Sequence, residues 1–210
     1  MKTHIQGSDS CRASLSALLL SVVVAVFSGG CSKEVPPVDQ SMPSAAAVTV
    51  NPGGPVTIKT PTAEFEILSS GYVRAYLLQD GKRLTLDDPG AEARTAGGYL
   101  VSEGKEIRDF VLDFGHVKTA EPRGKLGSRG KRVEIPAASS SDAAAGIEKT
   151  LAVEVYDDFP SMAVTAVSYK NVGAAEFKLD QAVEQFHRLD ASLADPKAPP
   201  YRLWSFQGSA

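Results

Sequence analysis

The residues best suited to bind a ligand stand near the end of the chain. They are three aromatic residues, an arginine and a glutamine, namely Tyr201, Arg202, Trp204, Phe206 and Gln207. Aromatic rings stack on the apolar faces of sugars, and the two polar side chains could hydrogen-bond sugar hydroxyls. The same residue types also pack in cores and at domain interfaces. We interpret residues 201–207, the aromatic segment, as a carbohydrate contact or a domain interface.

Two adjacent carboxylates, Asp157 and Asp158, could supply a pair for acid–base chemistry or a site for a cation. They stand directly before Phe159 and Pro160. Aspartate readily hydrogen-bonds its own backbone in turns, and proline cannot donate to a strand ladder. We therefore interpret the two aspartates as turn residues between strands.

A basic cluster is interleaved with glycines and consists of Arg123, Lys125, Arg129, Lys131 and Arg132. Such a segment could cradle an anion or a phosphate. It lacks the spacing of a P-loop and the strand-to-helix context which that motif requires. The pattern therefore favours a solvated hairpin loop.

The three histidines, His4, His116 and His187, are scattered and follow no metal-binding spacing. We expect neither a metal site nor a cofactor, and we assign no catalytic residue. A sugar mutarotase on a sandwich fold would need a His/Glu pair in a cleft. Only His116, His187 and Glu184 could provide that pair.

The amino terminus has the organisation of an export signal. Lys2 and Arg12 precede an uncharged apolar run at 13–27, and small residues at 28–30 lead directly to Cys31. The apolar run is shorter than the roughly 20 residues of a membrane-spanning helix. The pattern resembles a bacterial lipoprotein signal, although Ser28 stands where such signals usually carry Leu. We expect a signal peptide at 1–30, a lipid on Cys31 and attachment to the cell envelope, on its periplasmic or outer-membrane side. Plain secretion is the alternative.

Residues 31–47 are rich in Ser, Pro and Ala and predict a flexible linker between the membrane and a folded domain at 48–210. The formal net charge of the chain is -3, so no basic field favours nucleic acid as a partner.

Alternating apolar and polar residues predict β-strands along the domain. The clearest pattern is a pair of long antiparallel strands within 146–173, joined at 157–160 and placed at the centre of a sheet. Turn signals such as Asp80-Gly81 recur between the shorter runs. Residues 179–189 differ, because their apolar residues have helical spacing.

The chain resembles the amino-terminal domain of bacterial melibiase-type α-galactosidases. Four segments carry the resemblance: 154–160 (Glu-Val-Tyr-Asp-Asp-Phe-Pro), 168–173 (Ser-Tyr-Lys-Asn-Val-Gly), 187–190 (His-Arg-Leu-Asp) and 203–208 (Leu-Trp-Ser-Phe-Gln-Gly). The resemblance implies an all-β fold, an antiparallel β-supersandwich preceded by a signal helix and a disordered linker. It also implies that 179–189 form a strand, and we follow it there.

Enzymes of that family continue into a catalytic (β/α)₈ barrel with two aspartates, and such a barrel typically needs about 250 residues. Neither aspartate can be assigned to a position of this chain, and the chain ends soon after the aromatic segment. We therefore expect the non-catalytic β-sandwich domain of an exported α-galactosidase-like glycoside hydrolase, working on or near α-galactosides, with a catalytic barrel as its partner if the full-length protein contains one. The alternative is a stand-alone carbohydrate-binding or scaffold lipoprotein.

Overall fold

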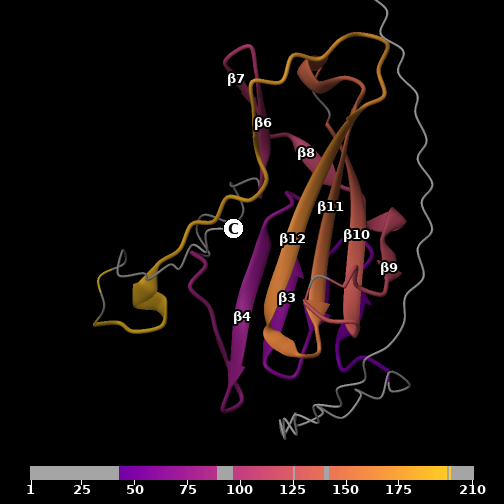
Figure 1. Cartoon of the computed structure of the whole chain (residues 1–210). Helices are drawn as coiled ribbons and strands as arrows, with labels where there is room; N and C mark the ends of the chain where they lie inside the picture. Colours follow the sequence, from indigo (N-terminus) through magenta and orange to yellow (C-terminus); the bar gives the residue numbers. More distant parts are fainter. Residues whose placement is uncertain (1–42, 89–96, 125, 140–141, 198, 200–210) are drawn as a thin grey trace, which may run out of the picture. The chain divides into compact units, whose positions relative to one another are not determined.

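A computed structural model describes residues 43–88, 97–124, 126–139, 142–197 and 199 (Figure 1). The predicted signal peptide and most of the predicted linker lie outside these residues. The described elements are strands and three short 3-10 helices. None of these helices is long and apolar enough to cross a lipid bilayer. The prediction of an all-β, antiparallel fold is confirmed for the described residues.

The first sheet is an antiparallel meander in the order β1-β2-β3-β4-β5. Its strands are β1 (Ala47–Val50), β2 (Val56–Lys59), β3 (Ala63–Ile67), β4 (Val73–Gln79) and β5 (Lys82–Leu84). Alternation sets its faces, because Phe65 and Ile67 are buried while Glu64 and Glu66 point to the outer face. The predicted β4–β5 turn is confirmed: Asp80 and Gly81 have φ angles of 50° and 73°, the left-handed conformation of a two-residue hairpin loop.

The second sheet has the order β12-β11-β10-β8, with β9 paired to β10. Its strands are β8 (Phe110–Leu112), β9 (Lys118–Ala120), β10 (Gly130–Ser139), β11 (Ile147–Tyr156) and β12 (Phe159–Asn171). The predicted long hairpin is β11–β12. Of its two strands only β11 lies inside the sheet, since β12 forms an edge of the described sheet. Pro160 lies in β12 rather than in the turn, next to the register shift at Tyr156, so it interrupts no regular ladder.

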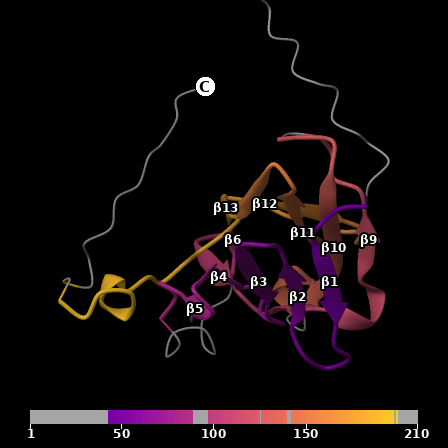
Figure 2. The same ribbon diagram turned by 90° about the horizontal axis from the view of Figure 1, so that it is seen from below.

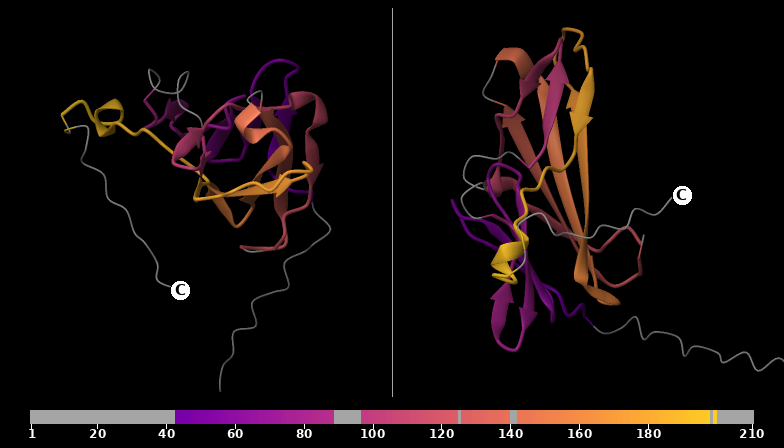
Figure 3. Two further views of the ribbon diagram at one scale, coloured as in Figure 1. Left: turned by 90° about the horizontal axis from the view of Figure 1, so that it is seen from above. Right: turned by 90° about the vertical axis from the view of Figure 1, so that its left-hand side faces the viewer.

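The third sheet is small and has the order β13-β6-β7, with β6 (Tyr99–Ser102), β7 (Lys105–Ile107) and β13 (Gln181–Val183). After β13 the chain runs without regular structure through residues 184–190, which we call the strap, to the 3-10 helix η3 (Ala191–Leu193). Figure 3 shows the strap in gold, passing from β13 toward η3. The other 3-10 helices are η1 (Phe114–His116) and η2 (Asp142–Ala144).

The apolar spacing of residues 179–189 predicts a helix, and this prediction is wrong. Residues 181–183 form β13, as the resemblance implied for part of this segment, and Leu189 makes an isolated antiparallel bridge with Asp87. The apolar residues do not share a buried face, since Leu179 and Phe186 are exposed. The backbone instead hydrogen-bonds to other parts of the chain: Phe186 N donates to Gly97 O and Asp190 N donates to Leu86 O. Such tertiary contacts override local helical preference.

The core lies between the first and second sheets, which Figure 2 shows as two facing layers. The first sheet contributes Ile58 and Ile67, and the second contributes Val133, Ile135 and Val153, all of them fully buried. The third sheet adds Leu100 and Ile107 to the same cluster. The described chain contacts this sandwich from Ser44 onward, because Ser44 Oγ donates to Asp157 Oδ1 over 2.7 Å.

Candidate functional site

The residues that we singled out from the sequence for ligand binding and lipidation lie outside the described residues. They are Tyr201, Arg202, Trp204, Phe206, Gln207 and Cys31. The carbohydrate contact and the lipid anchor therefore stay predictions.

Asp157 is a turn residue, as predicted, and it fastens two distant segments together. Its Oδ1 accepts hydrogen bonds from Ser44 Oγ and Ala45 N, and its Oδ2 lies 3.2 Å from Arg129 Nη2. Asp158 is exposed beside it. The two aspartates thus form the β11–β12 turn, and Asp157 holds the start of the sandwich against that turn.

The basic cluster forms ion pairs and leaves no described cation free to cradle a phosphate. Arg123 pairs with Glu134 over 3.1 Å and Lys131 pairs with Glu121 over 3.3 Å. Arg132 is buried and pairs with both Glu134 and Glu154. These contacts favour the predicted hairpin loop over the anion cradle. Lys125 lies outside the described residues.

His116 and His187 belong to separate networks. His116 Nδ1 lies 2.6 Å from Asp113 Oδ2 at η1, where both side chains are exposed. This hydrogen bond lowers the pKa of Asp113. His187 faces Asp87 instead, with Nδ1 3.5 Å from Oδ1. No described contact joins either histidine to Glu184, so the mutarotase interpretation gains no His/Glu pair. The described residues also contain no group of three or more potential ligands around a common metal position.

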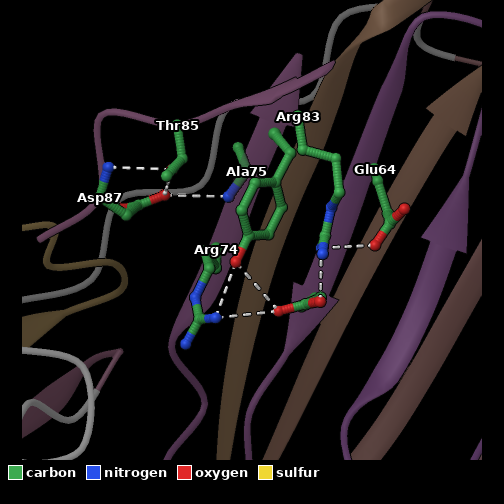
Figure 4. Close-up of polar contacts among 8 residues, drawn as sticks. Glu64, Arg74, Ala75, Arg83, Thr85 and Asp87 are labelled. Atoms are coloured by element: carbon green, nitrogen blue, oxygen red, sulfur yellow. Dashed lines mark hydrogen bonds and ion pairs between the residues drawn. The ribbon is translucent and has the colours of Figure 1, made fainter. Parts of the chain in front are cut away.

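Asp87 is the centre of a buried polar cluster that the sequence analysis did not single out. Tyr72 donates its hydroxyl to Asp87 Oδ1 over 2.7 Å. Ala75 N donates to Asp87 Oδ2 over 2.9 Å, a bond that Figure 4 shows. The Tyr72 and His187 rings meet edge to face with their centroids 5.2 Å apart. Tyr72 is fully buried and Asp87 is 3% exposed. Asp87 therefore joins strand β4 to the strap through groups shielded from water.

The environment of the cluster keeps Asp87 ionised and Tyr72 protonated. Burial opposes the charge on Asp87, but hydrogen bonds from His187, Ala75 and Tyr72 outweigh it and lower the pKa of this carboxyl. Burial, assisted by the hydrogen bond to Asp87, raises the pKa of Tyr72 to about 12. A neutral tyrosine and a carboxylate form a stable donor–acceptor pair across the neutral pH range.

The chemistry of the cluster suits attachment better than catalysis. A carboxylate on one ring nitrogen of histidine can orient that ring for proton transfer at the other nitrogen. Here, however, the cluster also bonds to the main chain of the strap: Arg188 N donates to Tyr72 Oη over 3.2 Å, and beside it Asp88 N donates to Arg188 O over 3.0 Å. These bonds fix the path of the strap along residues 86–88.

An apolar cleft, which we call the edge cleft, lies beside the Asp87 cluster. Its volume is about 260 Å³, and it is lined mainly by Phe65, Leu77, Leu84, Leu86, Ser161 and Leu189, together with Asp87. Leu77 and Leu189 are 52% and 42% exposed. The cleft is a surface on which an apolar group could pack.

Lys149 is a second buried polar group, on the core face of β11. It is 2% exposed, and its Nζ donates to Gly98 O over 3.4 Å. Nζ also lies 5.5 Å from the Phe110 ring centroid and 5.7 Å from that of Tyr169. Burial lowers the pKa of Lys149 to about 8. The ammonium therefore lies in an apolar setting with two aromatic rings but no carboxylate partner among the described residues.

The exposed face of the first sheet carries an ionic network that includes Glu64, Arg74 and Arg83 (Figure 4). Arg83 pairs with Glu64 and Glu66, each over 2.7 Å, and its guanidinium lies 3.8 Å from the centre of the Tyr76 ring. On the third sheet, Arg108 covers Tyr99 at 3.6 Å. Both tyrosines thus have a ring face occupied by arginine, which weighs against either of them stacking on a sugar.

Comparisons with protein-family models, with curated proteins and with solved structures found no match. The geometry described above and the sequence resemblance are therefore the basis of the proposal below.

Proposed function

We propose that this chain is the non-catalytic amino-terminal β-sandwich domain of an exported α-galactosidase-like glycoside hydrolase, anchored to the cell envelope by a lipid on Cys31. Its role is to present the following segment, and the catalytic barrel beyond it, at one edge of the sandwich. The finer fold within this proposal is a β-supersandwich.

The observation that carries the proposal is the attachment of the strap. A buried carboxylate, Asp87, and the Tyr72 hydroxyl hold the strap at the edge of the first sheet, beside the edge cleft. From the end of the strap the chain continues through η3 toward the aromatic segment. A fixed exit next to an uncovered apolar surface suits a domain that positions a neighbour.

Three of the four segments that carry the resemblance lie in the described part of the chain. Residues 154–160 span the β11–β12 turn, 168–173 include the end of β12, and 187–190 belong to the strap. Their contacts, such as those of Asp157 and His187, hold segments together. This agrees with a supporting domain whose reacting groups lie in another domain.

Hydrolysis of an aryl α-galactoside tests the proposal. We expect no turnover by the purified chain, because the paired carboxylates would belong to the barrel. A longer polypeptide in which the same residues precede such a barrel should hydrolyse the substrate. Turnover by the isolated chain that is lost in a folded Asp157→Asn variant would contradict the proposal.

A further inference from the structure

The edge cleft has a free side because the second sheet ends at β12. Strand β12, the edge of the described second sheet, contributes only Ser161 to the cleft, and the rest of the lining comes from β3, β4, β5 and residues 85–87 and 189. Leu77 and Leu84 form a cross-strand pair there, and Leu77 is 52% exposed. Apolar side chains gathered in a concave site gain free energy when an apolar group displaces water from them.

The chain that could fill this site starts next to it. Leu189 lines the edge cleft, and η3 follows two residues later. Asp195 N donates to Ala191 O over 3.1 Å, which closes one helical turn there. The nine residues from Asp195 to Trp204 can span up to about 30 Å when extended. Trp204 can therefore return to the cleft.

The composition of the aromatic segment fits an apolar site of this size. In an extended chain, alternate residues share a side, so Trp204 and Phe206 would face the same way. An indole ring carries a large apolar area and loses little conformational entropy on docking. A short tether also raises the effective concentration of the segment at the cleft into the millimolar range.

We propose that the aromatic segment docks on its own sandwich, with the Trp204 side chain in the edge cleft against Leu77 and Leu84. The docked segment covers the edge cleft, and the side chains that it leaves exposed form the surface that meets the following domain. The inference deepens the proposed interface role of residues 201–207 and rests on it, but it requires no sugar binding and no hydrolysis.

Tryptophan fluorescence tests the docking directly, because Trp204 is the only tryptophan of the chain. In the purified full chain we expect emission shifted to short wavelength and weak quenching by acrylamide. Leu77→Glu places a charge in the cleft at a side chain that is already half exposed. We expect this variant to shift the emission to long wavelength and to raise the quenching constant several-fold.

Val111→Glu is the matched control, because Val111 is an apolar strand residue of similar exposure, 56%, that does not line the cleft. It should keep the emission of the natural chain. A second variant, Ser161→Leu, fills the cleft instead of charging it and should also displace Trp204. Circular dichroism shows which variants remain folded, and the emission of the unsubstituted chain provides a test that needs no variant.

Long-wavelength emission from Trp204 in the unsubstituted chain, as from an indole in water, would overturn the inference. Short-wavelength emission that stays the same in folded Leu77→Glu and Ser161→Leu would overturn it as well. Trp204 would then be buried against another surface or against a second copy of the chain. Neither result depends on hydrolysis, so the inference can fail while the proposed function stands. Turnover by the isolated chain would instead refute the proposed function.

Discussion

At the residue scale, Lys149 differs from Arg132, the other buried basic side chain among the described residues. Arg132 pairs with Glu134 and Glu154, whereas Lys149 has only a carbonyl and two ring faces near its ammonium. Desolvating a cation without a counter-charge costs free energy, and the aromatic rings return only part of it. The charge on Lys149 should therefore destabilise the fold at neutral pH.

We predict that Lys149→Met stabilises the protein at pH 7. The pKa of Lys149 falls from its ordinary value of 10.5 to about 8, which corresponds to about 3 kcal/mol. Because the ring contacts are lost as well, we expect a gain of about 1–3 kcal/mol in the free energy of unfolding. Urea denaturation measures it.

The pH dependence of unfolding gives a second test of Lys149. Between about pH 8 and pH 10.5 the unfolded chain still holds the proton that folded Lys149 has lost, so the stability of the natural protein rises with pH in this range. The advantage of Lys149→Met should vanish by the upper end of it. Lys170→Met, at an exposed position of β12, is the control. An equal gain in both variants would show that burial of Lys149 is not the cause.

A pair of tyrosines tests the Asp87 cluster. Tyr72→Phe removes the hydroxyl that donates to Asp87 and accepts from Arg188 N, so the buried carboxylate loses one of its donors and Arg188 N loses its acceptor. We expect a loss of about 1–3 kcal/mol in thermal or urea unfolding. Tyr169→Phe is the control, because the Tyr169 hydroxyl is buried without a hydrogen-bond partner in the described chain. It should be neutral or stabilising. Equal losses would mean that the Tyr72 hydroxyl contributes no attachment.

At the scale of elements, the strap depends on close backbone packing against the chain before β6. A Cβ atom on Gly98 would lie 2.4 Å from Glu184 O and 2.6 Å from Val183 O. Such distances are too short for carbon and oxygen, so any side chain at residue 98 must push the strap away. Phe186 N donates to Gly97 O over 2.6 Å in the same region.

We therefore predict that Gly98→Ala loosens the strap while the two large sheets stay folded. Hydrogen exchange followed by mass spectrometry should show faster exchange in residues 184–190 and unchanged exchange in β10 and β11. Gly173→Ala is the control, since the nearest atom to a Cβ atom there is 3.3 Å away. Unchanged protection of 184–190 in Gly98→Ala would refute the close-packing argument.

Period-2 alternation predicted most strands of the described chain, because the faces of both large sheets are set by burial of alternate residues. The same alternation also predicts a buried position for Lys149. It lies two residues before Leu151 and four before Val153, and therefore on the same buried face of β11. The Asp87 cluster could not be predicted in the same way. Tyr72, Asp87 and His187 are far apart in sequence, and only the path of the strap brings them together. That path is set by long-range contacts that outweigh the helical spacing of 179–189.

At the scale of the whole molecule, the proposed lipid anchor makes a direct prediction. Cys31→Ala should release the protein from the membrane fraction, because the Ser/Pro/Ala-rich residues after Cys31 offer no apolar surface to hold it there. Fractionation and mass spectrometry of the mature amino terminus measure this. Cys11→Ala is the control, since Cys11 would be removed with the signal peptide. An unmodified mature start at another residue would exclude the anchor.

The strap has a mechanical consequence for a chain held at a membrane and pulled from its other end. Tension applied beyond Pro199 reaches the sandwich through Asp190, whose N–H donates to Leu86 O. The next bonds along the strap, at Asp88 N and Tyr72 Oη, are loaded only after that one breaks. The strap would thus peel open one bond at a time at low force, while the long ladders of β10, β11 and β12 remain intact. The strap would thus lengthen under a pulling force before the sandwich unfolds.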